Sequence, residues 1–177
     1  RVFSMSINFL VHVDDNNYGL LASRIDQITR SLDVLFVLSV GNLSNTSYRP
    51  EWPKKDTDVF KMLARHKSND KILQPSECAS AISVGAINHV ENEFVSRGVP
   101  TRYTLRGPST AYGIKPDITH YGGVADPSCS GLRTLNGQNQ VLTTSFGTSI
   151  AAPHVAKTIA CIDKISNEAL SPISLKA

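Results

Sequence analysis

Residues 34–40 read VLFVLSV, an apolar run without alternation between polar and apolar side chains. A strand of a parallel sheet has this composition, because both of its faces are covered. Large side chains recur before this run at steps of three and four along one helical face, namely Tyr18, Leu21, Ile25, Ile28 and Leu32. Residues 2–7 precede that helix and are apolar and β-branched enough for another strand. Strand, amphipathic helix and strand form a βαβ unit, so the sequence predicts an α/β protein.

Further elements follow along the chain. Residues 81–87, AISVGAI, predict another buried strand, and residues 141–144 predict a short one. Short helical patterns cover residues 57–66, and a longer helix is expected from residue 149 to residue 167. Residues 93–140 are rich in Gly, Pro and Ser, which favours loops with short strands.

The composition limits the classes of protein to consider. The 177 residues include 18 Lys and Arg against 15 Asp and Glu, and 41% are hydrophobic, as in one globular domain. The longest apolar run is far shorter than the roughly 20 residues that cross a bilayer, so no membrane segment is expected. The small positive charge is spread out, so no nucleic-acid partner is predicted.

The three cysteines, Cys78, Cys129 and Cys161, form no CxxC pair. An odd count without such a pair argues against a disulfide framework and against a zinc site. We therefore predict free, mostly buried thiols, with Cys161 in the core. Free thiols favour a reducing, intracellular compartment, and the sequence says nothing more about localisation.

The most specific stretch is residues 147–156, GTSIAAPHVA, where small residues precede a serine at the start of a helix. Gly147 permits a tight turn and a close approach of substrate. The N–H groups of a helix N-terminus point outward at Ser149, which favours a negatively charged oxygen there. The pattern predicts a serine nucleophile.

This stretch resembles the nucleophile motif of the subtilases, GTSMAAPHVAG, and differs within ten positions only at Ile150. Other parts of the chain resemble that family in the same order. They are residues 2–8, like the family's substrate-pairing strand; 37–42, like the strand that ends in its oxyanion asparagine; Pro75 with 81–86; and 106–108 with 114–118, like its RGP and KPD motifs. The resemblance implies a three-layer fold with a mostly parallel sheet and helices on both faces.

The resemblance also implies roles for individual residues. Ser149 would be the acylating nucleophile, and the Asn42 side chain and the Ser149 N–H would form the oxyanion hole. The remaining residues implied in substrate binding are Ser6, Ile7, Asn8, Ser39, Val40, Gly41, Gly147 and Thr148. They would flank an extended peptide and frame the pocket for the residue before the scissile bond. The activity implied is that of a serine endopeptidase with a protein or peptide substrate.

The base and the acid of a catalytic triad are not recognised in this sequence. In the subtilases both precede the substrate-pairing strand, so residues 1–177 resemble a partial peptidase domain that lacks its N-terminal side. His154 follows Ser149 by five positions, about 140° around a helix, so the two side chains are not expected to face each other. We interpret His120 as a surface-loop residue. The isolated chain is therefore predicted to be inactive.

Several alternatives stay open. The chain could instead be a noncatalytic subtilase-like module that binds peptides or partners, or, less in keeping with the motifs, an unrelated βαβ binding domain. No cofactor and no metal ligands are predicted; the family allows calcium, but no ligand set is recognisable. Residues 43–75 form a longer loop or insertion after Asn42. A sheet that lacks one side exposes apolar surface, so self-association is also expected.

Overall fold

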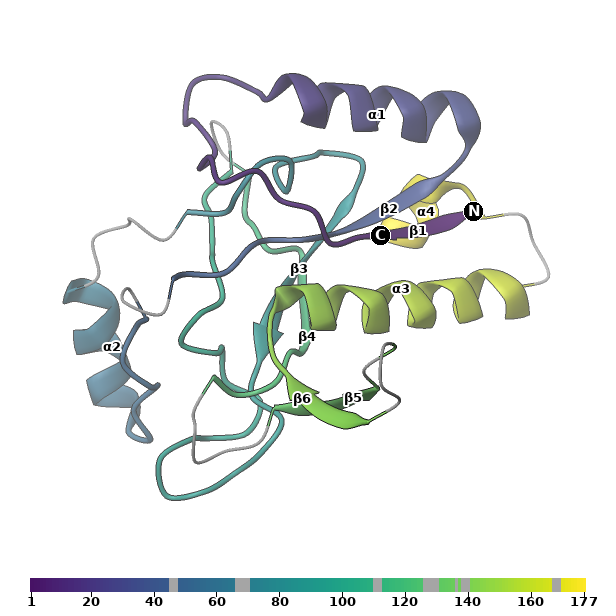
Figure 1. Ribbon diagram of the computed structural model, residues 1–177. Helices are drawn as coiled ribbons and strands as arrows, with labels where there is room; N and C mark the ends of the chain where they lie inside the picture. The colour runs from purple at the N-terminus through teal and green to yellow at the C-terminus, as the bar shows by residue number, and fades with distance from the viewer. Residues whose placement is uncertain are drawn as a thin grey trace.

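Figure 1 shows the computed structural model of the chain. The structure describes residues 1–44, 48–65, 71–109, 113–125, 131–135, 137, 141–166 and 170–177. Its strands are β1 (Val2–Met5), β2 (Leu35–Ser39), β3 (Ile82–Ile87), β4 (Ile118–Tyr121), β5 (Leu132–Leu135) and β6 (Leu142–Ser145). Its helices are α1 (Leu20–Leu32), α2 (Asp56–Arg65), α3 (Thr148–Ile165) and α4 (Pro172–Lys176).

The main sheet has the strand order β1-β2-β3-β4, and every neighbouring pair in it is parallel. Strands β5 and β6 form a separate antiparallel hairpin that leads into α3. The predicted α/β class and the predicted parallel sheet are therefore confirmed. Since the strands are parallel, the segments that follow them meet at one edge of the sheet, and the N-terminus of α3 lies at the same edge.

The sheet lies between α1 on one face and α3 on the other, which gives three layers (Figure 1). Strand β2 shows how the sequence specifies them, because its side chains alternate between the faces. Leu35 and Val37 join the core beneath α3, whereas Leu38 joins Ala22 and Ile25 of α1. Both faces of this strand are buried, which is why its sequence shows no alternation.

The predicted buried face of α1 is partly wrong. Ile28 and Leu32 are exposed, and the buried residues of the helix are Ala22, Ile25, Asp26 and Thr29. The physical reason is the Asp26 carboxylate, which accepts hydrogen bonds from the Tyr18 hydroxyl and from two backbone N–H groups of the segment before β3. A buried carboxylate needs such donors, and meeting them fixes the rotation of the helix.

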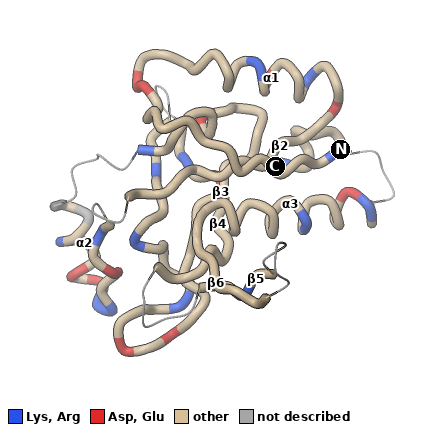
Figure 2. Tube along the Cα trace, viewed as in Figure 1, with Lys and Arg blue, Asp and Glu red and all other residues tan. Residues whose placement is uncertain are grey.

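Residues 43–75 contain α2, close to the helix expected over residues 57–66. Both ends of this segment are held, because the Leu43 N–H donates to the Tyr103 carbonyl at 2.7 Å and the Leu73 N–H to the Val40 carbonyl at 3.0 Å. Residues 45–47 and 66–70 of the segment lie outside the described residues. Charged side chains of both signs are spread along the chain rather than gathered in one stretch (Figure 2).

Two of the three cysteines lie within the described part, and neither of them is in a disulfide. Cys78 is buried as predicted, and burial raises its pKa, so its thiol keeps the proton. Cys161 is exposed, which corrects the expectation of a core position. The opposite face of α3 carries the buried residues, among them Val155 and Ile159. Cys129 lies outside the described residues.

Candidate functional site

A tight turn between β6 and α3 positions Ser149. The Gly147 N–H donates to the Gly122 carbonyl at 2.8 Å and to the Tyr103 hydroxyl at 3.1 Å. That hydroxyl in turn donates towards the carbonyls of Gly122 and Gly123 at 2.7 and 2.9 Å. Tyr103 is fully buried, and burial raises its pKa, so the phenol stays protonated and can donate. The turn is thereby held from beneath.

Gly147 is required in this turn for two reasons. Its φ of +147° lies in a region that residues with a side chain rarely adopt. A Cβ atom at this position would lie 3.0 Å from the Ser149 Oγ and 3.3 Å from the Asn42 Nδ2. The hydroxyl of Ser149 and the amide nitrogen of Asn42 therefore approach the same point in space from two different segments.

Asn42 follows β2 and is bound to the start of α3. Its Oδ1 accepts hydrogen bonds from the Thr148 N–H at 3.0 Å and from the Thr148 hydroxyl at 3.1 Å. Because a backbone N–H can only donate, these bonds fix which way the amide points. The Thr148 hydroxyl also accepts from the Gly41 N–H at 3.2 Å. The Nδ2 group of Asn42 is left without a partner among the described residues.

Ser149 is the second residue of α3, and its backbone N–H is one of the helix donors that no helical carbonyl can satisfy. Neither this N–H nor the side-chain Oγ has a hydrogen-bond partner in the described part of the chain. Two free donors, the Ser149 N–H and the Asn42 Nδ2, thus lie beside one free hydroxyl. Such an arrangement can hold a developing negative charge on an oxygen atom.

The segment after β1 lies against the same helix start. The Ser149 carbonyl would normally accept from the N–H four residues later, but that residue is Pro153, which has none. The Ser6 hydroxyl donates to this carbonyl instead, at 3.2 Å. Asn8 and Ser39 exchange two hydrogen bonds, from Nδ2 to carbonyl at 2.7 Å and from hydroxyl to Oδ1 at 2.9 Å.

The residues predicted to bind substrate differ in exposure. Ser6 and Ile7 are exposed, and Asn8 is half-buried; Asn42, predicted for the oxyanion hole, is exposed. Ser39, Val40, Gly41, Gly147 and Thr148 are buried. Val40 also has both backbone groups occupied, since its N–H donates to the Val84 carbonyl and its carbonyl accepts from Leu73. Val40 therefore supports the site from below.

None of the four described histidines, His12, His89, His120 and His154, donates to or accepts from the Ser149 hydroxyl. The His154 ring stacks on His120, with centroids 4.9 Å apart and an interplanar angle of 10°. His120 was predicted to lie in a surface loop, but it lies in β4 and is half-buried. Burial, and the neighbouring His154, lower the pKa of His120.

The KPD motif serves the architecture. Lys115 is buried, and its Nζ contacts the Asp117 carboxylate at 2.6 Å and donates to the Cys78 carbonyl at 3.0 Å. The same carboxylate accepts from the N–H and the hydroxyl of Ser83 in β3, both at 2.7 Å.

Within the described residues, no three His, Cys, Asp or Glu side chains gather as metal ligands would. No helix there is long and apolar enough to cross a membrane.

The model of the subtilase family matches residues 1–177. The chain therefore belongs to the subtilase family. Its sequence identity to individual proteins is low. What it shares with the solved structures is the fold.

An uncharacterized protein, y4bN, from Sinorhizobium fredii (strain NBRC 101917 / NGR234) is 26% identical over 88% of this chain and 42% of its own length. A protease from Pseudoalteromonas arctica PAMC 21717 has a TM-score of 0.62 and 17% identity over 99% of this chain and 42% of that one. Sphericase has a TM-score of 0.61 and 23% identity over 99% of this chain and 46% of its own. The chain thus spans less than half the length of each of these relatives.

Sequence reasoning missed Tyr103, since its only local context is a polar loop. We expect Tyr103→Phe to destabilise the protein by about 1–3 kcal/mol, because a buried carbonyl and the Gly147 N–H lose a partner. Tyr121→Phe is the matched control, since it removes only an exposed bond from Arg97. We expect it to change stability by no more than about 0.5 kcal/mol. Urea denaturation of both variants measures the difference, and equal midpoints would contradict the role given to Tyr103.

Proposed function

We propose that this chain provides the nucleophile and the oxyanion hole of a serine endopeptidase. The observation that carries the proposal is the convergence of the Ser149 Oγ and the Asn42 Nδ2 on one point beside Gly147, with the Ser149 N–H free at the helix N-terminus. Membership of the subtilase family supports the same chemistry.

In the proposed reaction, the Ser149 Oγ attacks the carbonyl carbon of a peptide bond. The carbonyl oxygen becomes an oxyanion and accepts hydrogen bonds from the Asn42 Nδ2 and the Ser149 N–H. The C–N bond then breaks, the amine leaves with a proton, and water later hydrolyses the ester on Ser149. Only protein groups and water take part in these steps.

The proton of the Ser149 hydroxyl must go to a general base. The described histidines do not contact this hydroxyl, so we propose that the base and its orienting acid come from residues outside the described part. Because the subtilases carry this base and its acid before the strand that β1 resembles, we propose that the 177 residues alone are inactive.

For the substrate, we propose an extended peptide whose acyl half lies along residues 6–8. The segment is exposed at Ser6 and Ile7, and the Ser6 hydroxyl donates a hydrogen bond to the carbonyl of Ser149. Backbone hydrogen bonds to such a segment would give affinity without selecting a side chain.

A noncatalytic function is the second candidate. The observation that favours it is the absence of a histidine contact at the Ser149 hydroxyl within the described residues. A module of this kind would keep the peptide-binding edge and would bind peptides or protein partners without cleaving them.

Reaction of the whole protein with a fluorophosphonate probe distinguishes the two functions. We expect intact-mass spectrometry to show one adduct in the wild type and none in Ser149→Ala, since the probe needs an activated serine. A chain of the 177 residues alone should stay unlabelled. Failure of the whole wild-type protein to react would favour the noncatalytic module.

The role of Asn42 can be separated from its bonds to Thr148. Asn42→Ala should lower kcat for peptide hydrolysis by about 10²–10³-fold, which is the loss on removing the oxyanion asparagine of a subtilisin. Asn42→Asp keeps the acceptor for Thr148 but removes the donor. We expect it to be impaired at least as much, because its charge repels the oxyanion. Wild-type kcat in Asn42→Asp would restrict Asn42 to a structural role; Asn16→Ala is the control for an exposed asparagine.

We also propose that another polypeptide packs on the surface beside β1. Strand β1 pairs only with β2 among the described strands, and exposed apolar side chains follow it, namely Phe9, Leu10 and Val11. A chain of the 177 residues alone should therefore self-associate, since such a patch and a free strand edge favour association. Sedimentation velocity at increasing concentration measures this, and a monomer throughout would contradict it.

A further inference from the structure

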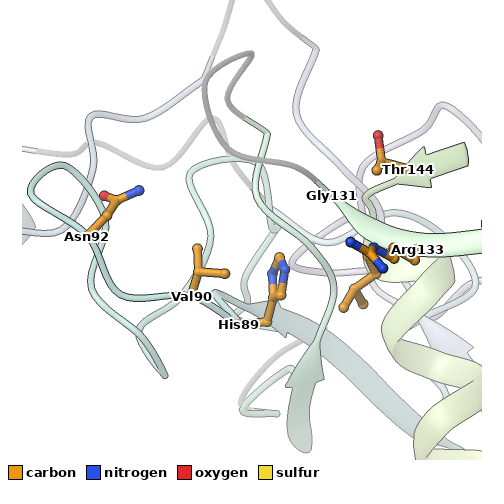
Figure 3. A pocket seen from close by; sticks show the side chains of 7 residues that line it. His89, Val90, Asn92, Gly131, Arg133 and Thr144 are labelled. Atoms are coloured by element: carbon orange, nitrogen blue, oxygen red, sulfur yellow. The ribbon is translucent and has the colours of Figure 1, made fainter.

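A cavity lies at the same edge of the sheet as Ser149. It has a volume of about 510 Å³ and is lined by the segment after β3 on one side and by the β5–β6 hairpin on the other (Figure 3). Its lining residues are His89, Val90, Asn92, Gly131, Leu132, Arg133 and Thr144. None of these seven residues is acidic.

The wall of the cavity carries one cation, the exposed side chain of Arg133. Arg133 in β5 lies opposite Thr144 in β6, so the two side chains emerge on the same face of the hairpin, and both line the cavity. Arg133 has no ion pair and no side-chain hydrogen bond with any described residue. A guanidinium can bind a carboxylate through two parallel hydrogen bonds, and Thr144 places a hydroxyl beside it.

The described lining residues of the opposite wall, His89, Val90 and Asn92, carry no negative charge. The Nδ1 atom of His89 is buried and has no hydrogen-bond partner in the described structure. Burial and the positive charge of Arg97 lower the pKa of His89. The acid closest in sequence, Glu91, lies 3.6 Å from the Lys54 ammonium and accepts from the Arg97 N–H at 2.5 Å.

The position of the cavity relates it to the peptide-binding edge. Residues 6–8 follow β1, Asn42 follows β2, and His89 follows β3, and these strands are neighbours in that order. The cavity therefore lies on the side of Asn42 away from residues 6–8. Strand β6, which carries Thr144, runs directly into the turn before Ser149. A peptide whose acyl half lies along residues 6–8 would direct its leaving half towards this cavity.

We infer that the cavity binds a carboxylate on the leaving-group side of the scissile bond, with Arg133 and His89 as its contacts. The carboxylate would come from an Asp or Glu side chain or from the C-terminus of the peptide. This inference rests on the proposed function for its position in the substrate, but the contacts themselves do not depend on catalysis.

Binding can be measured without turnover in the whole protein carrying Ser149→Ala. The probes are fluorescent decapeptides of Ala and Ser with an amidated C-terminus and a single Glu at successive positions, each matched by a peptide with Gln. A second pair differs only in a free or an amidated C-terminus. We expect a carboxylate at one position to lower Kd in fluorescence anisotropy by about tenfold, as one charge-assisted contact does.

The preference should depend on the cavity. Arg133→Gln should abolish it, and Arg133→Glu should make the corresponding Lys peptide bind more tightly instead. Arg24→Gln, an exposed arginine of α1, is the matched control and should keep the preference. Equal Kd values for all Glu and Gln pairs and for the two C-termini, or a preference that persists in Arg133→Gln, would overturn the inference.

Fluorophosphonate labelling of the wild type in parallel keeps the two proposals apart. Labelling without any carboxylate preference overturns the cavity inference alone. An Arg133-dependent preference without labelling leaves a carboxylate-binding cavity on a noncatalytic module.

Discussion

The two hydrogen bonds from Thr148 to Asn42 are the constraint on which the site depends. They connect the residue after a central strand to the first residue of α3, and the amide oxygen of Asn42 accepts both of them. Because the oxygen is used in this way, the nitrogen of the same amide points towards Gly147 and Ser149. The sheet edge, the turn and the helix N-terminus are thus placed by one side chain, and the rest of the fold holds that side chain where it is.

Local patterns in the sequence predict the layers well, because they reflect burial. The uninterrupted apolar run of β2 reflects the burial of both of its faces, and the small residues at 147–149 indicate a turn into a helix. The structure also brings Ser149 and Asn42 together, although they lie far apart in the sequence. That juxtaposition follows from parallel strands, which all deliver their carboxyl ends to one edge.

The features that could not be predicted are those in which a polar group finds a distant partner. The Asp26 carboxylate fixes the rotation of α1, because it accepts hydrogen bonds from N–H groups of the segment before β3. Periodicity alone predicts instead that the larger apolar side chains of the helix are buried. Tyr103 and the stack of His120 on His154 depend in the same way on contacts between remote segments. The cavity beside Arg133 could not be predicted either, since it exists only where the hairpin approaches the segment after β3.

Pro153 has a consequence for communication across the sheet edge. Because Pro153 lacks an N–H, the carbonyl of Ser149 has no donor four residues later in the helix, and it accepts a hydrogen bond from the Ser6 hydroxyl. The first turn of α3 is therefore hydrogen-bonded to the segment after β1, which precedes it by more than 140 residues. A peptide that binds along residues 6–8 would therefore lie one hydrogen bond away from the backbone of the nucleophile residue.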